Sequence, residues 1–465
     1  MVFSSLTFIY YFLPLVLLFY FIIPSKYKNL VLLISSLLFY FYGEKEYTII
    51  LILSCIINYY SAKFIEKSNN KTSKIILIIT TIINLGLLCY FKYTNFFINN
   101  INSIFNSNIN PLNVVMPIGI SFFTFQTLSY VIDVYNKKVK ASNNFIDFAC
   151  YVCLFPQLVA GPIVRYSDIN KELKNRKTSF NNFSIGSKRF IIGLSKKILI
   201  ANVIGEFINI LQNLNNQSIL SYILIAISFS IQIYFDFSGY SDMAIGLGKI
   251  FGFNFLENFN YPYIAKSITD FWRRWHMSLS SFFRDYVYIP LGGNRKGVKK
   301  QIRNIFIVWM LTGFWHGANW NFIIWGLYFG ILLIIEKFFL KDFLDKHKIF
   351  SHIYTLFLVI ISFVIVNSNS IADIFSFLKN MFGFTNIPFV NNETIYYFKS
   401  YLILLIISIL ASTPLFKNIY LKIKNTNKCK ILFDMLESII YIGLLILCTA
   451  FLIDSSFNPF LYFRF

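Results

Sequence analysis

The sequence predicts a polytopic α-helical membrane protein, and three observations support that prediction. Of the 465 residues, 56% are hydrophobic and only 14% are charged, with a mean hydropathy of +0.60, whereas soluble domains carry roughly 25% charged residues. Several stretches approach the roughly 20 apolar residues that a helix needs to cross a hydrocarbon core. These stretches are continuously apolar, whereas membrane-spanning strands alternate apolar and polar side chains, so helices are predicted.

Six stretches, distributed over the whole chain, are the clearest candidates for spanning helices: residues 6–24, 75–91, 219–235, 353–366, 401–416 and 438–453. Six further candidates are weaker or interrupted: residues 29–42, 47–62, 114–132, 146–160, 188–212 and 305–335. The first 25 residues carry no charged side chain, so they lack the basic start of a cleavable signal peptide. We interpret them as a retained first span.

The distribution of charge predicts the topology. A formal net charge of +21 would suit a nucleic-acid-binding protein, but the basic residues lie in short loops such as "SKYKN", "NKKVK" and "NRKGVKKQIR". Basic loops tend to remain cytoplasmic. Residues 93–113 and 213–218 are rich in Asn and almost uncharged, as outside loops can be. We therefore expect an N-terminus outside the membrane, contact with membrane lipids, and no nucleic-acid partner.

A single membrane domain over residues 1–465 is predicted, because no Pro-rich or Ser-rich linker separates two soluble parts. Residues 1–135 and 336–465 hold conventional spans, whereas 136–335 is expected to form a core with re-entrant and cytoplasmic segments. In that core, "CLFPQLVAGPIVRY" (153–166) contains helix-breaking Pro and Gly and is flanked by basic loops. It is predicted to enter the membrane and return on the same side, with its backbone buried in protein or lining a wet cavity.

The string "GFWHGANW", at residues 313–320, places a histidine inside a long uncharged stretch, because no charged residue occurs between Arg303 and Glu336. The stretch exceeds one span and its glycines permit a helix break, so His316 is predicted at a break beside a cavity. A second histidine, His276, lies in "DFWRRWHMSLSS". An ionisable side chain at membrane depth is by default a functional hypothesis, and imidazole exchanges protons near neutral pH.

The alternative for both histidines is structural: each would hydrogen-bond to a neighbouring backbone group and fix local packing. The other two histidines, His347 and His352, lie in or beside the charged loop "KDFLDKHKIFSH". They are predicted to be solvated and without a functional role.

Two scarce residue types concentrate around the same region. All six tryptophans lie between residues 272 and 325, whereas a membrane belt would spread them over helix ends at both interfaces. Five of the nine arginines fall there too: Arg273, Arg274, Arg284, Arg295 and Arg303. The planar guanidinium suits bidentate contacts to carboxylate or phosphate. The concentration indicates a binding site, and a structural network of salt bridges is the alternative.

Other kinds of site find little support in the sequence. His276 and His316, with Asp270 and Asp285 nearby, are too loosely spaced for a metal site, and no metal is expected. The pair of cysteines in "CYVC" stands in an apolar run without a second pair, so packed thiols are predicted. GxSxG, P-loop and GxGxxG motifs do not occur.

Two acidic residues, Asp236 and Asp242, follow directly on an apolar run in "IYFDFSGYSDMAIGLGKIFGF". The glycines in this string let a helix turn or approach another backbone closely. Asp236 and Asp242 either line a cavity or take part in packing, and the sequence leaves both interpretations open.

Five long strings resemble the membrane-bound O-acyltransferases, and most closely the bacterial branch that contains the alginate O-acetylation membrane component and its peptidoglycan O-acetylating relatives. The strings are "MPIGISFFTFQTLSYVIDVY", "FPQLVAGPIVRYSDI", "YFDFSGYSDMAIGLGKIFGFNF", "NFNYPYIAKSITDFWRRWHMSLSSFFRDYVYIPLGGNR" and "LTGFWHGANWNFIIWG". The opening of the chain and the closing "PFLYFRF" are also similar to that branch.

The resemblance implies a bowl of about 11 or more spanning helices with re-entrant segments, thinned at the middle, where a tunnel links a cytoplasmic funnel to the outer face. The family's invariant histidine corresponds to His316, and its second position, occupied by Asn or His, corresponds to His276. Both are expected to be catalytic. The expected donor-binding residues are Arg273, Arg274, Arg295, Trp275 and Trp315, and the expected cavity-lining residues are Asp236, Asp242 and Asn319.

The same resemblance implies a mechanism without a bound cofactor. A cytoplasmic thioester, acetyl-CoA or an acyl-carrier protein, would supply the acetyl group, and His316 would act as base on an acceptor hydroxyl while His276 assists the donor carbonyl. The acceptor would be an extracytoplasmic polysaccharide, reached directly or through an acetyltransferase or esterase-like partner protein. The expected location is the bacterial cytoplasmic membrane.

Two competing functions remain open at the level of sequence. The first is D-alanyl transfer to teichoic acid from a carrier-protein thioester, within the same family. The second is a transporter or flippase without acyl-transfer chemistry, because broken helices and polar residues at the midplane also occur in transporters. Against a transporter, the sequence shows no inverted halves.

Overall fold

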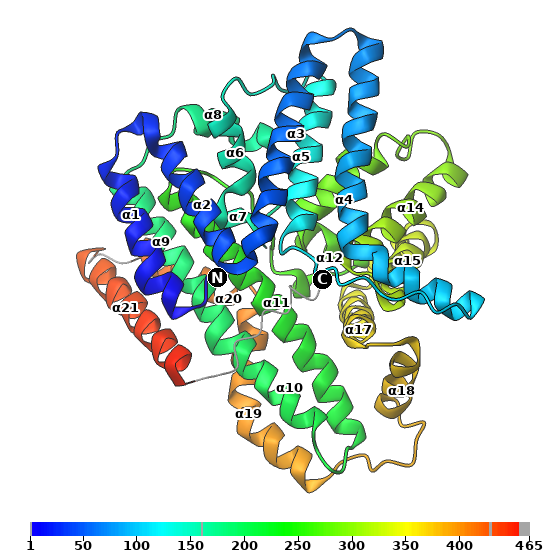
Figure 1. The fold of residues 1–465 in the computed structure, drawn as a ribbon. Helices are drawn as coiled ribbons and strands as arrows, with labels where there is room; N and C mark the ends of the chain where they lie inside the picture. The colour runs from blue at the N-terminus through cyan, green and yellow to red at the C-terminus, as the bar shows by residue number, and fades with distance from the viewer. Residues whose placement is uncertain (1, 160, 427–429, 455–465) are drawn as a thin grey trace. The chain divides into compact units, whose positions relative to one another are not determined.

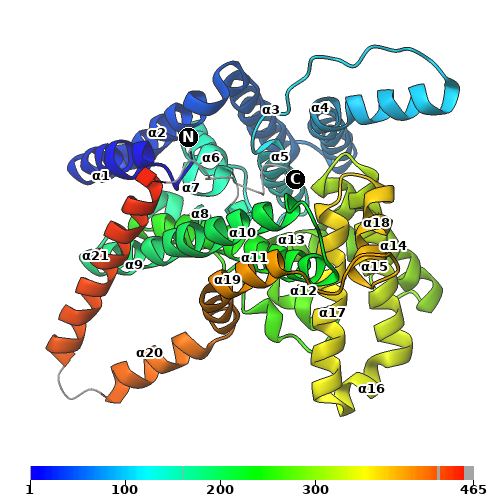
Figure 2. The same ribbon diagram turned by 90° about the horizontal axis from the view of Figure 1, so that it is seen from below.

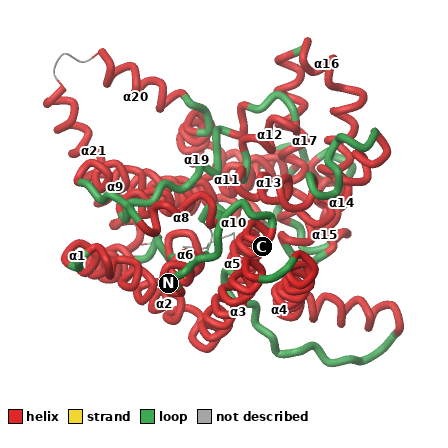
Figure 3. Tube along the Cα trace, turned by 90° about the horizontal axis from the view of Figure 1, so that it is seen from above, coloured by secondary structure: helices red, strands yellow, loops and turns green. Residues whose placement is uncertain are grey.

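The chain is built from helices and loops. The computed structural model describes residues 2–159, 161–426 and 430–454, without the side chains of 426 and 430–432, and in these ranges every regular element is a helix (Figures 1 and 3). Seven of the described helical stretches are long and apolar enough to cross a membrane, and Phe8–Ile22 is a shorter apolar helix. The predicted all-α multi-pass fold is confirmed. The closing "PFLYFRF" lies outside the described residues.

The predicted spans are realised with different lengths. The stretch Ser25–Lys67 contains two helices, α2 (Lys28–Glu44) and α3 (Thr48–Lys67), joined by a 3-10 turn at Lys45–Tyr47. The candidate at 114–132 becomes α5 (Ile120–Tyr135), with 16 residues, fewer than the roughly 20 of a full crossing. The number of crossings, about 11 or more, therefore stays a prediction.

The helices form two compact units, residues 1–190 with 241–256 and residues 191–240 with 257–465. Two helices pass from one unit to the other: α9 (Phe180–Ser195) and α11 (Ile219–Ile250). The first unit holds the remaining early helices: α1 (Leu13–Ile22), α2, α3, α4 (Asn70–Phe105), α5, α6 (Phe145–Cys153), α7 (Phe155–Leu158) and α8 (Tyr166–Lys174). The second unit holds the later ones: α10 (Val203–Gln212), α12 (Ile268–Arg274), α13 (Met277–Phe283), α14 (Val298–His316), α15 (Trp320–Ile335), α16 (Lys341–Lys346), α17 (Lys348–Asn367), α18 (Ile371–Met381), α19 (Asn392–Ala411), α20 (Leu415–Thr426) and α21 (Lys430–Asp454).

In the first unit, the segment predicted to be re-entrant is broken and buried. The chain leaves α6 at Cys153 and makes the short helix α7, and residues 161–165 form no regular element. Tyr151 Oη donates a hydrogen bond of 3.1 Å to the carbonyl of Val164. The two cysteines of "CYVC" are buried free thiols, as predicted, and Cys153 Sγ lies 3.7 Å from Cys55 Sγ. The irregular backbone is thus enclosed by protein, as non-helical backbone at membrane depth requires.

In the second unit, α14 and α15 form a closely packed hairpin (Figure 2). Glycines make the close approach possible, because a Cβ on Gly313 would overlap the carbonyl oxygen of Phe322, and a Cβ on Gly326 would overlap that of Trp309. Helix α17 packs against α15, and Tyr328 Oη donates 2.9 Å to the carbonyl of Leu358. The hairpin and α17 together hold the turn that contains the predicted helix break.

Candidate active site

The helix break at His316 is confirmed. Helix α14 ends at His316, Gly317 is extended (φ −167°, ψ 154°), and α15 begins at Trp320. Amides from the turn bind the loop that follows α17: Asn321 Nδ2 donates 2.7 Å to the carbonyl of Ser368, and Asn319 Nδ2 donates 3.1 Å to that of Asn369. The side chain of Asn319 therefore anchors the turn.

A small cavity of about 20 Å³ lies beside His316, and we call it the His316 cavity. That volume has room for roughly one water molecule. The cavity is lined by Ile233, Phe237, Trp275, His316, Phe322, Trp325, Phe363 and Val366. Apart from the imidazole and the two indole N–H groups, the lining side chains are apolar, so the cavity disfavours bulk water.

The imidazole of His316 lies between two tryptophans. Its ring contacts Trp315 and Trp325 edge-on, each with centroids 4.9 Å apart. The indole nitrogen of Trp325 is buried and has no hydrogen-bond partner among the described residues. Leaving a buried donor unsatisfied costs about 1–3 kcal/mol. Because Trp325 also lines the cavity, its indole N–H is a candidate donor to a ligand oxygen.

His276 is fully buried at a strained backbone position, φ 44° and ψ 53°, where α12 gives way to α13. Its Nδ1 lies 3.1 Å from Asn258 Oδ1, an oxygen that also accepts the Ser278 N–H at 3.2 Å. Because Asn258 Oδ1 can only accept, this network assigns the ring proton to Nδ1 and leaves Nε2 as an acceptor. Burial lowers the pKa of His276 to about 3, so the ring is neutral at physiological pH.

Trp315 links the two histidines. Its ring centroid lies 4.9 Å from that of His316 and 6.0 Å from that of His276. Trp275 lines the His316 cavity and contacts Phe363 at 5.4 Å between centroids. The structure therefore brings four of the predicted site residues together: both histidines and both tryptophans.

The predicted donor-binding arginines are less closely grouped. Arg273 and Arg274 end α12, directly before Trp275. Arg273 is exposed, and Arg274 pairs with Asp270 at 2.9 Å. Arg295 is exposed in the loop before α14, and no described contact joins it to the other two. A shared phosphate site for these arginines stays a prediction.

The two acidic candidates are each held by a basic residue. Asp236 forms an ion pair with Lys197, with Nζ and Oδ1 2.6 Å apart and both side chains almost fully buried in the second unit. Asp242 accepts from Arg189 at 2.8 Å in the first unit. These ion pairs favour the packing interpretation over cavity lining.

The predicted solvation of the remaining histidines holds for one of them. His347 is exposed. His352 is only half-buried rather than solvated, and its Nδ1 lies 3.0 Å from the carbonyl oxygen of Ala265. The correction has a simple cause, because the helix α17 extends back to Lys348 and places His352 against the segment before α12.

Several residues that hold the second unit together were not among the predicted site residues. Lys197 is an ionisable residue within an apolar run, and that signal could have identified it. Glu336 is buried and accepts the Ile268 N–H at 2.6 Å and the Thr269 N–H at 3.1 Å, which caps α12. Asn258 and Phe363 carry no comparable signal, because only the tertiary fold brings them to the histidines. Among the described residues, no group of three or more His, Cys, Asp or Glu side chains is placed to hold a metal ion.

The helical fold and the buried histidine at a helix break define a multi-pass membrane protein with a candidate acyl-transfer centre. Residues 36–368 match the model of the membrane-bound O-acyltransferase family. The chain is 40% identical to a probable alginate O-acetylase of Pseudomonas aeruginosa (83% of this chain, 75% of that one) and 35% identical to the peptidoglycan O-acetyltransferase of Helicobacter pylori (100% and 98%). The chain belongs to the membrane-bound O-acyltransferase family and is an acyltransferase.

The family match covers both histidines, and the resemblance seen in the sequence is confirmed. The teichoic acid D-alanyltransferase of Bacillus subtilis is 34% identical, but over 50% of this chain and 61% of its own. The D-alanylating relatives are therefore more distant than the O-acetylating ones. None of these matches is a transporter.

Proposed function

We propose that the protein transfers an acetyl group from a cytoplasmic thioester, acetyl-CoA or an acyl-carrier protein, to hydroxyls of an extracytoplasmic polysaccharide in the bacterial cytoplasmic membrane. The observation that carries the proposal is His316, which ends α14 beside a small apolar cavity. The O-acetylating relatives, which match most of the chain, support acetyl over D-alanyl transfer. The acetyl group reaches the polymer either directly or through a secreted partner protein that relays it, and the proposal includes both routes.

The ends of the helices support an orientation. The turn after His316 is hydrogen-bonded to the loop after α17, so these segments lie at one end of the hairpin. Basic residues occupy the opposite ends of the same helices: Lys299, Lys300, Lys341, Lys346 and Lys348. Since basic loops tend to stay in the cytoplasm, His316 lies toward the outer face in this proposal.

The chemistry follows from the groups around the cavity. The acceptor hydroxyl attacks the thioester carbonyl, a C–O bond forms, and His316 takes the hydroxyl proton. The C–S bond then breaks, and the thiolate receives the proton from His316. The indole N–H of Trp325 donates to the carbonyl oxygen as negative charge develops there. The apolar lining keeps water from hydrolysing the thioester.

His276 acts as a positioning residue in this scheme. Its neutral ring is fixed by Asn258 and contacts Trp315, which in turn contacts His316. The cavity itself has room for about one water molecule. An acetyl group is larger, so one or more lining side chains must turn aside when the donor enters.

The decisive experiment uses the purified full-length protein in liposomes with labelled acetyl-CoA, and in parallel with acetyl-loaded carrier protein. The transferase consumes thioester in the presence of acceptor, whereas a transporter would leave it intact. His316→Ala should lower the turnover by about 10²–10⁴-fold, the contribution of a general base. The exposed His347 provides the control, and His347→Ala should retain full turnover. Normal turnover in correctly inserted His316→Ala protein would show the mechanism to be wrong.

A further inference from the structure

A second cavity, of about 160 Å³, lies next to the His316 cavity, and we call it the Asp373 cavity. The two cavities share Phe363, whose side chain lines both and is only 3% exposed. Phe363 belongs to α17, whose last residue, Asn367, also lines the Asp373 cavity. A group held in the larger cavity therefore contacts a side chain that also lines the His316 cavity.

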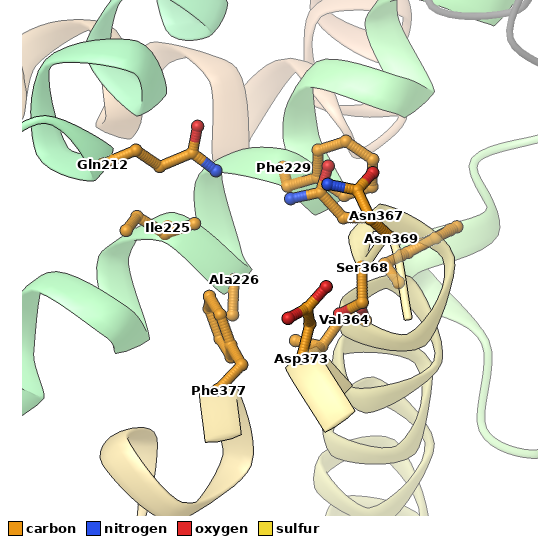
Figure 4. A pocket seen from close by; sticks show the side chains of 11 residues that line it. Gln212, Ile225, Ala226, Phe229, Val364, Asn367, Ser368, Asn369, Asp373 and Phe377 are labelled. Carbon is orange, nitrogen blue, oxygen red and sulfur yellow. The ribbon is translucent and has the colours of Figure 1, made fainter. Parts of the chain in front are cut away.

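Five polar side chains line the Asp373 cavity: Gln212, Asn367, Ser368, Asn369 and Asp373. Three of them come from three different helices (Figure 4). Gln212 ends α10, Asn367 ends α17, and Asp373 lies in the first turn of α18. None of these three side chains makes a hydrogen bond or ion pair with the described residues. The N-terminus of α18 also favours a negative charge at Asp373. The cavity thus offers the amides of Gln212, Asn367 and Asn369 and one carboxylate to a ligand.

The shape and the chemistry of the cavity suit one sugar unit. Its volume corresponds to roughly five water molecules at liquid density. A carboxylate accepts hydrogen bonds, while an amide both donates and accepts, which matches adjacent hydroxyls that do the same. Phe229 and Phe377 line the cavity and supply apolar surface for the C–H groups of a sugar ring.

The charge of the lining makes the site selective. Asp373 is the one ionisable residue among the side chains that line the cavity in the described part of the chain, and no Lys, Arg or His is present there. A carboxylate on the ligand would meet a like charge without a counterion, which disfavours it. A hydroxyl would instead find an acceptor at the same position.

We propose that the Asp373 cavity binds one uncharged sugar unit of the acceptor polysaccharide and that Asp373 discriminates against uronic acids. The proposal rests on the direct route of the proposed function, in which the polysaccharide itself reaches His316, and it adds the chemical class of that acceptor. It also predicts a difference from the relatives named alginate O-acetylases, because alginate is a polymer of uronic acids. The hydroxyl to be acetylated would reach His316 when Phe363 turns aside.

The test compares two soluble probes, a tetramer of N-acetylglucosamine and a tetramer of mannuronate. The wild-type protein, supplied with acetyl-CoA, should show a KM for the neutral probe about 2–5-fold below that for the acidic one, because Asp373 is exposed and charge contacts in solvent are weak. Asp373→Asn should lower the KM for mannuronate and so reduce the ratio of the mannuronate KM to the N-acetylglucosamine KM. Asp373→Lys should invert that ratio. The exposed carboxylate of Asp345 on α16 provides the matched control, and Asp345→Asn should leave the ratio unchanged.

Binding of both probes to His316→Ala, measured by calorimetry, separates this proposal from the proposed function. Tighter binding of the neutral probe that depends on Asp373 would support the site even if the wild-type protein consumed no thioester, an outcome that would overturn only the acetyl-transfer proposal. Binding of neither probe, preference for mannuronate, or a ratio unchanged in Asp373→Asn would overturn the sugar site. Acetyl transfer to a partner protein without binding of either probe would also overturn it.

Discussion

In the first unit, buried Asn58 and Asn84 exchange two amide hydrogen bonds of 3.0 Å between α3 and α4, and Thr127 of α5 adds a third at 3.3 Å. In the second unit, Trp325 and Asp373 each line a cavity, and neither the buried indole N–H of Trp325 nor the exposed carboxylate of Asp373 has a hydrogen-bond partner among the described residues. The first arrangement joins three helices. The second leaves polar atoms directed at space that a ligand can occupy.

The role of a polar residue within an apolar sequence therefore cannot be assigned from its residue type alone. A polar pair that is mutually satisfied stabilises the contact between helices, because an unpaired group would be costly there. A buried polar atom without a partner, such as the indole N–H of Trp325, carries that cost until a ligand binds. Lys197 and Asp236 show that the second unit contains the paired kind as well. Mutations of paired residues should therefore change stability, whereas mutations of residues that line a cavity should change turnover or ligand binding.

The largest expected effect concerns the ion pair. Lys197→Met removes the ammonium that lies 2.6 Å from the buried Asp236 carboxylate, and breaking a buried pair costs about 3–5 kcal/mol of stability. The double variant Lys197→Met with Asp236→Leu should recover most of that loss, because the apolar pair leaves no buried charge. Thermal unfolding in mild detergent measures both. If Lys197→Met were as stable as the wild type, the ion pair would make no net contribution to stability.

The next effect concerns Trp325, and Trp272 is its matched control. Both indole nitrogens are buried without a hydrogen-bond partner in the described structure, but only Trp325 lines the His316 cavity. Trp325→Phe should lower kcat for acetyl transfer by about 10²-fold or more, the effect of losing one oxyanion donor. Trp272→Phe should leave kcat near that of the wild type, and neither change should alter the KM for acceptor. Equal losses of kcat in the two variants would show that Trp325 acts only through packing.

A smaller effect is expected in the first unit. Asn84→Leu removes the partner of Asn58, whose amide still reaches the carbonyl of Ser54 at 2.8 Å. The unfolding free energy should fall by about 1–3 kcal/mol, the cost of leaving a buried polar group unsatisfied. Replacing both residues by Leu should restore part of that loss. Turnover per folded molecule, measured with acetyl-CoA, should not change, and a fall in kcat would contradict the purely structural role.

The sequence predicts the fold class and the helix break for clear physical reasons. Long apolar runs leave few structures other than spanning helices, and "GFWHGANW" combines glycines with an uncharged stretch too long for one span. The position of His316 at the end of a helix, buried beside a cavity, follows from that string. The predicted grouping of His276, Trp275 and Trp315 near it is also found.

The remaining features depend on contacts between distant parts of the chain. Nothing near His276 in sequence marks Asn258 as its partner, and the pairing of Asp236 with Lys197 joins a helix to a preceding π-helical turn. The Asp373 cavity takes its polar groups from the ends of three helices and from the loop after α17. Phe363 is one aromatic residue within an apolar helix, so its place between two cavities is visible only in three dimensions.

The smallest expected effect therefore concerns Phe363 as the wall between the cavities. Phe363→Leu keeps an apolar side chain but removes part of the ring, so water from the Asp373 cavity should reach the bound thioester more often. Hydrolysis of acetyl-CoA without acceptor should rise by about 2–5-fold, since exclusion of water is what suppresses this side reaction. The control is Phe329→Leu, an equally buried ring that lines neither cavity. Because both variants lose similar packing, only a rise confined to Phe363→Leu identifies the wall, whereas equal hydrolysis in the two would assign the effect to loosened packing.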